Sequence, residues 1–452
     1  MDKGNNNRFA GLEVPSEEEF LNCIRCGLCL SACPIYREHL IETQSPRGRV
    51  ALIRKMVEGE LDPTHRLTDQ MYQCMGCLAC NVACPVGIKP GDLVMETRTL
   101  LEEYQPHWWK RPLFRSLFMH PTVLEVSAWP LRLYQKLGLQ RAFHGLGLNN
   151  ALPHQLRDME RMVPELPQRP LRQVLPEFVP ARGPRRYRVG FFLGCIQSLM
   201  FADGSSASVE VMTRNGCDVY TPSTVTCCGM PPMGYGEIET GRAMARQNVD
   251  VFEKMDIDVI VTDCATCGST LKEYPKLLAG DPAYTDRAAV FAKKVRDISE
   301  FLMQIPIDPP KAELNVRVTY HDPCHLVRGQ NLREQPRRLL KMIPGLQFVE
   351  MKEADWCCGA AGTQIMTHYE NSMALLDRKI DNVANTKAEV LASGCPGCQL
   401  QLGLGVERRG LNVRVVHPIQ LLAEAYRKET EVPVQEKQAA EQAEPEEVLV
   451  IS

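Results

Sequence analysis

Short apolar runs alternate with helical patterns along the later part of the chain. Four runs have the length and the β-branched or aromatic content of buried strands: residues 188–193, 258–262, 316–320 and 389–391. A helical pattern over residues 237–255 precedes the second of these runs. Strands that alternate with helices indicate βαβ units, which form mostly parallel sheets. We therefore expect two α/β lobes, at residues 187–312 and 313–428.

The N-terminal part of the chain has a different, helical pattern. Apolar positions recur at helical spacing from Val50 to Val57. The preceding Ser45 and Pro46 suit the start of a helix, because serine caps the first turn and proline fits its first position. We expect an α-helical domain at residues 1–105 and, for the whole chain, a multidomain α+β fold.

Two further segments differ in composition from these domains. Residues 106–186 begin with an aromatic and basic helical segment and continue as a linker, where seven prolines between Pro153 and Pro184 predict little regular structure. Residues 429–452 are rich in glutamate, so we expect an acidic, disordered tail.

Composition and charge exclude several classes of function. The chain has 52 Lys and Arg residues against 55 Asp and Glu residues, a net charge of −3, which argues against a nucleic-acid-binding protein. No apolar run approaches the length of about 20 residues that a membrane-spanning helix needs. The polar N-terminus lacks the apolar stretch of a secretory signal. We expect a cytoplasmic protein.

One stretch leaves membrane association open. Residues 108–129 contain three of the four tryptophans, together with phenylalanine and arginine, and such side chains suit a membrane interface. Peripheral contact with the inner face of a membrane is therefore one interpretation. Packing against a neighbouring domain or subunit is the interpretation that we favour.

The cysteine content is the most informative feature for function. In a reducing compartment, 19 cysteines favour metal binding or redox chemistry over disulfide bonds. Eight of them form two C-x2-C-x2-C-x3-C-P quartets, 51 residues apart: Cys23, Cys26, Cys29 and Cys33, then Cys74, Cys77, Cys80 and Cys84. This is the bacterial ferredoxin spacing, in which three cysteines bind one [4Fe–4S] cluster and the fourth binds the other.

The quartets thus predict two cubane [4Fe–4S] clusters in an α-helical ferredoxin domain. The ligand sets expected from the spacing are Cys23, Cys26, Cys29 and Cys84 for one cluster, and Cys74, Cys77, Cys80 and Cys33 for the other. Structural zinc is the alternative, but zinc takes four ligands in two pairs, and overlapping triplets fit that arrangement poorly.

Ten more cysteines form a longer repeat. Its copies read C-x31-CC-x35-C-x2-C and C-x32-CC-x36-C-x2-C: Cys195, Cys227, Cys228, Cys264 and Cys267, then Cys324, Cys357, Cys358, Cys395 and Cys398. Several of these cysteines follow predicted strands, at the sheet edge where α/β proteins bind ligands. Two pseudo-symmetric lobes would bring both pentads close together. The vicinal pair Cys227-Cys228 suits an extended iron–sulfur unit better than one tetrahedral ion. Gly229 permits a positive φ and a close approach of the backbone to such a unit.

Three residues near the repeats need separate interpretation. His321 and His325 flank Cys324, where they would tune a cluster by hydrogen bonding or deliver protons. Loop histidines satisfied by backbone carbonyls are the alternative that we favour. Cys217 belongs to neither repeat, and we expect it to be a small buried residue.

The combined patterns resemble the iron–sulfur subunit of glycolate oxidase. The matching stretches are residues 23–34, 45–49, 192–197, 272–274 and 357–363. The doubled cysteine-rich pattern, called the CCG domain, is also similar to that of heterodisulfide reductase and of the iron–sulfur subunits of lactate and anaerobic glycerol-3-phosphate dehydrogenases. Glycolate oxidase subunits often lack one pentad cysteine, whereas this chain keeps all ten.

The resemblance implies further metal centres in the CCG lobes. In heterodisulfide reductase relatives the five-cysteine motifs hold noncubane [4Fe–4S] clusters, and in some relatives one pentad binds zinc instead. Two further clusters, one cluster with one zinc ion, and one or no further centre therefore all stay open for the two pentads.

Function follows from what the chain carries and what it lacks. No G-x-G-x-x-G follows a predicted strand and no Walker A motif occurs, so we expect no flavin on this chain. Oxidation of a hydroxy acid needs a flavin or a nicotinamide. The resemblance therefore implies an iron–sulfur subunit that relays electrons from an FAD-containing dehydrogenase subunit, which oxidises glycolate, D-lactate or a similar 2-hydroxy acid, to a quinone or another carrier.

Three alternatives are kept. The first is a catalytic subunit, similar to that of heterodisulfide reductase, that reduces a disulfide or a quinone at noncubane clusters. The second is the iron–sulfur subunit of an anaerobic glycerol-3-phosphate dehydrogenase. The third, a scaffold stabilised by zinc, fits the ferredoxin quartets poorly.

Overall fold

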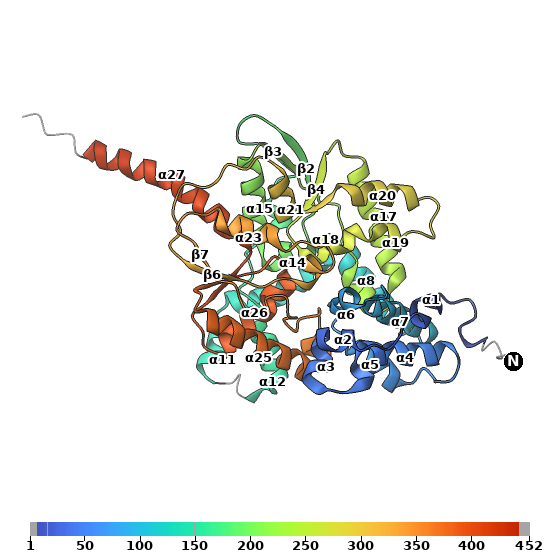
Figure 1. The fold of residues 1–452 in the computed structure, drawn as a ribbon. Coiled ribbons are helices and arrows are strands. Elements are labelled where there is room, and N and C mark those ends of the chain that lie inside the picture. Colours follow the sequence, from blue (N-terminus) through green and yellow to red (C-terminus); the bar gives the residue numbers. More distant parts are fainter. Residues whose placement is uncertain (1–6, 16, 148–150, 443–452) are drawn as a thin grey trace, which may run out of the picture.

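The computed structural model describes residues 7–15, 17–147 and 151–442, and its N-terminal domain is helical, as expected (Figure 1). The elements of this domain are η1 (Asn7–Phe9), α1 (Glu17–Leu21), α2 (Leu28–Ala32), α3 (Pro34–His39), η2 (Glu42–Gln44), α4 (Pro46–Val57), α5 (His65–Tyr72), α6 (Ala79–Ala83) and α7 (Pro90–Tyr104). Ser45 caps α4 as predicted, because its Oγ accepts a hydrogen bond from the N–H of Gly48 at 2.9 Å. Helices α4, α5 and α7 enclose an apolar core that includes Ile53, Met71 and Leu93.

The segment between the domains is more regular than its prolines predict. Its helices are α8 (Lys110–Met119), α9 (Pro121–Ser127), α10 (Trp129–Lys136), α11 (Leu139–Gly145), α12 (His154–Met162) and α13 (Leu171–Val174). Pro153 and Pro170 directly precede α12 and α13, so these prolines start helices instead of interrupting them. Helix α12 packs on the second lobe, where Asp158 accepts a hydrogen bond from the hydroxyl of Tyr369 at 2.6 Å.

The first lobe contains a five-stranded sheet in the order β1-β3-β2-β4-β5. Its strands are β1 (Phe178–Val179), β2 (Tyr187–Phe191), β3 (Cys217–Tyr220), β4 (Val259–Thr262) and β5 (Val295–Asp297). Its helices are α14 (Cys195–Met200), α15 (Ala202–Arg214), α16 (Met230–Gly234), α17 (Ile238–Glu253), α18 (Ala265–Lys272), α19 (Tyr274–Leu277), α20 (Thr285–Lys294) and α21 (Ile298–Gln304). All strand pairs are parallel except β1 with β3. Because β1 precedes residue 187, the sheet begins earlier than the predicted lobe.

The second lobe repeats this topology without the antiparallel edge strand. Its sheet has the order β7-β6-β8-β9, and all its pairs are parallel, so the prediction of mostly parallel sheets is confirmed. The strands are β6 (Arg317–Tyr320), β7 (Gln347–Phe348), β8 (Val390–Ala392) and β9 (Arg414–Val416). The helices are α22 (Cys324–Val327), α23 (Glu334–Lys341), α24 (Gln364–Thr367), α25 (Tyr369–Thr386), α26 (Pro396–Arg408) and α27 (Pro418–Gln442).

One apolar core joins the two lobes. It contains Val189 of the first sheet, Val318 of the second sheet and Tyr426 of α27, all of which are buried. Helix α27 packs on α15 and then projects from the body of the molecule (Figure 1). It continues to Gln442, so residues 429–442 of the expected disordered tail are helical, in keeping with the high helix propensity of alanine, glutamate, glutamine and lysine. Residues 443–452 of that tail lie outside the described residues.

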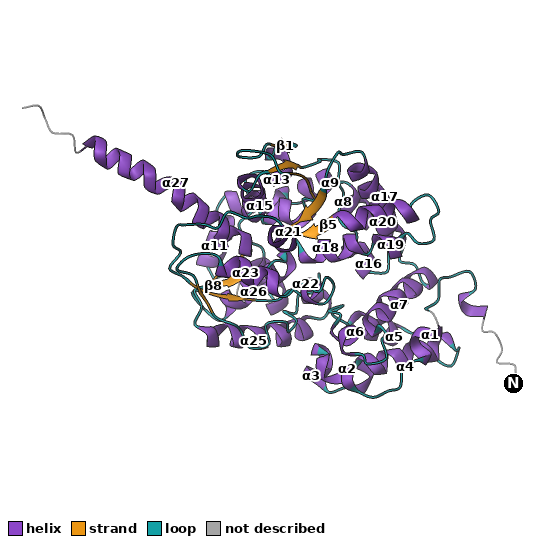
Figure 2. Cartoon of the chain, turned by 45° about the horizontal axis from the view of Figure 1, so that its top comes forward, coloured by secondary structure: helices purple, strands orange, loops and turns teal. Residues whose placement is uncertain are grey.

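The N-terminal helices form a body of their own beside the two lobes (Figure 2). None of the helices in the described ranges is both long enough and apolar enough to cross a membrane.

Candidate iron–sulfur sites

The N-terminal quartets lie at two cavities, and each cavity takes its fourth cysteine from the other quartet. The thiol-bearing residues of the first cavity are Cys23, Cys26, Cys29 and Cys84. Those of the second cavity are Cys33, Cys74, Cys77 and Cys80. The structure therefore brings together the two sets of side chains that the ferredoxin spacing predicts.

The two cavities differ in burial. Cys26 at the first cavity is exposed, whereas Cys33 and Cys77 at the second cavity are buried. Burial raises the pKa of the Cys33 thiol to about 11, against an opposing effect of the nearby Arg49 charge, and it raises the pKa of Cys80 well above its usual range. Thiolates at the second cavity therefore need compensating positive charge, which bound iron ions supply.

The pentad cysteines lie where strands end and helices begin. Cys195 is the first residue of α14, and Cys264 caps α18, where its Sγ accepts a hydrogen bond from the N–H of Cys267. In the second lobe Cys324 is the first residue of α22 and Cys395 precedes α26. This placement follows the topology of the lobes, since ligand sites of open α/β sheets lie at the carboxyl ends of strands.

Glycine follows the vicinal cysteines in both lobes, with a positive φ of 97° at Gly229 and 90° at Gly359. The positive φ predicted for Gly229 is thus confirmed, and its counterpart shares it. Hydrogen bonding from Cys357 lowers the pKa of Cys358 well below its usual range, while the same contact raises that of Cys357. Hydrogen bonding from Cys227 lowers the pKa of Cys228 in the same way, so each vicinal pair offers one readily formed thiolate, as metal binding requires.

A single cavity of about 660 Å³ unites the two pentads. All ten pentad cysteines line it, together with residues of the N-terminal domain such as Tyr72 and Met75. The hydroxyl of Thr266 in the first lobe lies 3.4 Å from the Sγ of Cys395 in the second. The expectation that pseudo-symmetry brings the pentads together is thus met, and the volume accommodates cofactor-sized groups.

The second cavity of the N-terminal domain lies against the second lobe. Cys33, Met75 and Cys77 belong to one apolar cluster with Trp356 and Cys357. Arg328 bridges the same two domains. Its guanidinium donates to the carbonyl oxygen of Cys77 at 3.2 Å and to that of Asp355 at 2.7 Å.

Both candidate histidines lie close to pentad thiols. His321 is 1% exposed, and one of its ring nitrogens lies within 4.8 Å of the Sγ atoms of Cys358 and Cys398. The Nδ1 of His325 lies 3.4 Å from the Sγ of Cys324, and burial lowers the pKa of this imidazole. Among the described residues neither ring hydrogen-bonds to a backbone carbonyl, so the favoured interpretation of carbonyl-bonded loop histidines does not describe them.

Cys217, the cysteine outside both repeats, lies in β3 with no exposed surface. It belongs to the apolar core that joins the lobes, and burial raises the pKa of its thiol to about 12. Its predicted role as a small buried residue is therefore confirmed.

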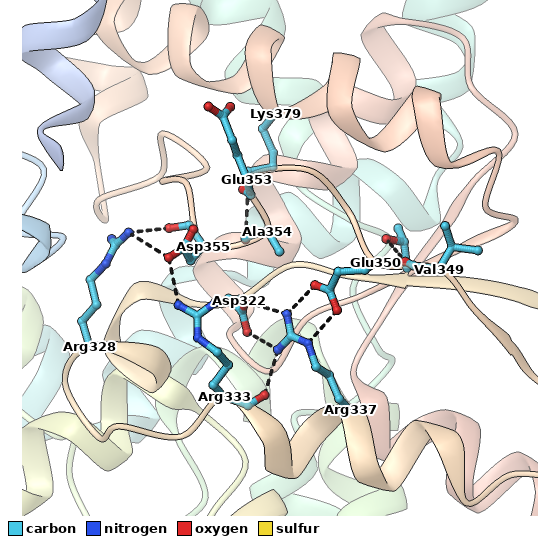
Figure 3. A network of polar contacts seen from close by, with 11 residues as sticks. Asp322, Arg328, Arg333, Arg337, Val349, Glu350, Glu353, Ala354, Asp355 and Lys379 are labelled. Carbon is cyan, nitrogen blue, oxygen red and sulfur yellow. Dashed lines mark hydrogen bonds and ion pairs between the residues drawn. The ribbon is translucent and has the colours of Figure 1, made fainter. Parts of the chain in front are cut away.

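Buried cations surround the second quartet and the second pentad, and the sequence reasoning did not single them out. The guanidinium of Arg98 donates to the carbonyl oxygen of Cys74 at 2.7 Å. Lys379 is fully buried and donates to the carbonyl oxygen of Ala354 at 3.2 Å, close to the network of Asp322 and Arg337 (Figure 3). Only tertiary contacts reveal these roles.

The aromatic and basic stretch packs on the first lobe with one side. The backbone N–H of Cys227 donates to the carbonyl oxygen of Phe118 at 3.0 Å, and Arg111 pairs with Glu237 at 3.1 Å. Its other side faces solvent, with Trp108 87% exposed. The favoured contact with a neighbouring domain is observed, and membrane contact stays a prediction.

Fold and cysteine sets together define an iron–sulfur protein with a dicluster domain followed by two cysteine-rich domains. Comparison with protein families agrees with this class: the 4Fe-4S dicluster domain matches residues 19–88 and the cysteine-rich domain CCG matches residues 189–272 and 318–403. The linker region of the glycolate oxidase iron-sulfur subunit matches residues 105–163.

Similar proteins narrow the assignment. The probable glycolate oxidase iron-sulfur subunit of Bacillus subtilis is 38% identical over 423 residues, which cover 91% of this chain and 95% of that protein. The glycolate oxidase iron-sulfur subunit of Escherichia coli is 27% identical over 90% of this chain and 94% of its own length. Lactate utilization protein A of Oceanobacillus iheyensis is 33% identical over 52% of this chain and 96% of its own length. The chain belongs to the glycolate oxidase iron–sulfur subunit family.

Proposed function

We propose that this chain is the iron–sulfur electron-transfer subunit of a flavin-dependent dehydrogenase that oxidises glycolate or D-lactate. The observation that carries the proposal is the arrangement of four cysteine sets in one contiguous series. The names of the relatives from Bacillus subtilis and Oceanobacillus iheyensis support the substrate class.

The proposed ligands are the two crossed quartet sets and the two pentads. The first cluster would be held by Cys23, Cys26, Cys29 and Cys84 and the second by Cys33, Cys74, Cys77 and Cys80. The pentads would hold noncubane clusters, or zinc in one lobe. Iron–sulfur clusters at these sites supply one-electron transfer.

The order of the sites along the molecule supports a relay. Pro90 lines both quartet cavities, so these lie side by side. The second quartet in turn adjoins Cys357 of the second pentad, whose cavity also contains the first pentad. The order is first quartet, second quartet, second pentad and first pentad.

The two ends of this series suit different partners. Ile24 and Val86 line the first quartet cavity and are 65% and 42% exposed, which suits docking of a protein such as the FAD-containing dehydrogenase subunit. A small electron acceptor such as a quinone would bind at the opposite end of the series, beside the centres of the pentads. Peripheral membrane contact through the exposed face of Trp108 would bring the chain close to a quinone pool.

The crossed ligand sets give the proposal its sharpest test. Cys84→Ser in the anaerobically purified chain should alter the EPR signal of the cluster built on Cys23, although residue 84 belongs to the other quartet. Cys217→Ala is the matched control, because this thiol lies in the core away from all four sites. Alteration of only the cluster built on Cys74 would refute the crossed assignment.

A disulfide-reducing or quinone-reducing catalytic subunit is the second candidate. The observation that favours it is that all ten pentad cysteines face one cavity of about 660 Å³. If the isolated chain, continuously supplied with electrons by reduced methyl viologen, catalyses the reduction of low-molecular-weight disulfides to thiols, this candidate replaces the relay. Identification of the co-purifying flavoprotein separates both from a glycerol-3-phosphate dehydrogenase subunit.

A further inference from the structure

The two lobes place different side chains at one equivalent position. Phe192 and His321 both lie three residues before the first cysteine of their pentad. The backbone N–H of Phe192 donates to the carbonyl oxygen of Val261 at 2.8 Å, and that of His321 donates to Ala392 at 2.9 Å. Since β4 and β8 occupy the same place in the two sheets, the positions correspond in space as well as in sequence.

Both rings are buried, but their chemistry differs. Phe192 is fully buried in the apolar cluster that contains Cys227, Cys228 and Cys264, and its ring offers neither a lone pair nor an N–H. His321 is 1% exposed, and a ring nitrogen lies within 4.8 Å of the Sγ atoms of Cys358 and Cys398.

One nitrogen of this buried imidazole lacks a protein partner. The Nδ1 atom of His321 forms no hydrogen bond within the described ranges. A buried polar atom without a partner costs free energy, so native proteins provide a partner for it. His321 lines the same cavity as Cys358 and Cys398, so a centre held by these thiols lies within reach of its imidazole.

We propose that His321 gives the metal centre of the second lobe a nitrogen contact that the first lobe cannot supply. The two lobes then hold centres of different chemistry, sulfur alone in the first and sulfur with nitrogen in the second. This inference rests on the proposed occupancy of the pentads and deepens it.

The contact has a definite electronic effect. A neutral imidazole bound to iron adds no negative charge, and an N–H directed at a sulfur stabilises the more negative, reduced state. Both arrangements raise a reduction potential, as histidine ligation does in Rieske centres. The second pentad, which adjoins the second quartet through Cys357, would thus hold an arriving electron more tightly than the first pentad.

The test compares 14N and 15N-histidine protein by pulsed EPR. The reduced, anaerobically purified wild-type chain should show a histidine nitrogen coupling at one pentad centre. His321→Phe, which recreates the first-lobe residue, should lose that coupling and reduce the equilibrium constant for reduction of that centre at least tenfold, or 59 mV for one electron. His65→Phe is the control, because His65 lines the same cavity but is exposed.

The outcomes separate this inference from the proposed function. About 16 irons per chain without a histidine coupling in the wild type, or with a coupling that persists in His321→Phe, would overturn the inference alone. About 8 irons and no zinc would overturn the occupancy of the pentads and the inference with it. Zinc in the second lobe with a nitrogen neighbour at about 2.0 Å, absent in His321→Asp, would support it.

Discussion

The buried charge of Arg49 offers a direct test of how the protein tunes its second quartet. The side chain is 1% exposed and lines the cavity of Cys33, Cys74 and Cys77. Its Nε donates to the carbonyl oxygen of Gln70 at 2.9 Å, while its Nη2 has no hydrogen-bond partner among the described residues. No carboxylate in the described part of the chain forms an ion pair with it, so its charge acts on the cavity uncompensated.

The size of the effect follows from Coulomb's law. For an assumed separation of about 8 Å and an effective dielectric constant of about 20, Coulomb's law gives about 2 kcal/mol for the interaction of two unit charges. For a one-electron couple this corresponds to about 90 mV. Arg49→Gln should therefore lower the reduction potential of the second centre by about that amount, because the positive charge stabilises the more negative, reduced state.

An EPR-monitored redox titration of the anaerobically purified chain measures this shift. Arg49→Lys should restore most of it, because it keeps the charge. Arg47→Gln is the matched control, since Arg47 lines the first cavity but is paired with Glu42 at 2.8 Å and should leave the second centre unchanged. An unchanged second potential in Arg49→Gln, with full iron content, would refute the reasoning.

Three substitutions in the second lobe test its structure. Gly359→Ala should lower the metal content of the second lobe more than Gly229→Ala lowers that of the first lobe, as measured by metal analysis. The added Cβ would lie 2.4 Å from the carbonyl oxygen of Ser372 at residue 359, whereas the nearest atom at residue 229 lies at 3.4 Å. Asp322→Asn should lower the Tm more than Glu350→Gln, since it weakens the buried bidentate pairing of Arg337, a loss of up to about 3–5 kcal/mol (Figure 3). Hydrogen bonding from Arg378 lowers the pKa of Glu353 from 4.5 to about 2. This carboxylate therefore stabilises the fold above pH 4.5 and loses that contribution as the pH falls toward 2. The Tm difference between wild type and Glu353→Gln should shrink over this pH range.

Short sequence patterns correctly predicted the structural features that depend only on residues adjacent in the chain. The cap at Ser45, the strand before Cys195 and the positive φ of Gly229 each follow from a few adjacent side chains, and the structure contains all three. The crossed quartets were also predictable, because the ferredoxin spacing leaves the fourth cysteine out of reach of its own triplet.

Features that depend on tertiary contacts escaped the sequence. The sequence around Pro153 predicts a linker, whereas in the structure this residue precedes α12, which packs on Tyr369 of the second lobe. The sequence around Arg328 does not indicate a role for this residue, whereas in the structure its guanidinium donates to the carbonyl oxygen of Cys77. The two segments joined by each contact are more than 200 residues apart, so no local pattern indicates them.

Freeze-quench EPR of this chain in complex with its flavoprotein partner tests the central claim most directly. After mixing with glycolate or D-lactate, signals of reduced centres in this chain should appear at least as fast as the complex turns over, and Cys84→Ser should slow transfer to the acceptor without slowing reduction of the flavin. Steady turnover with the physiological acceptor while every centre of this chain stays oxidised would contradict the account.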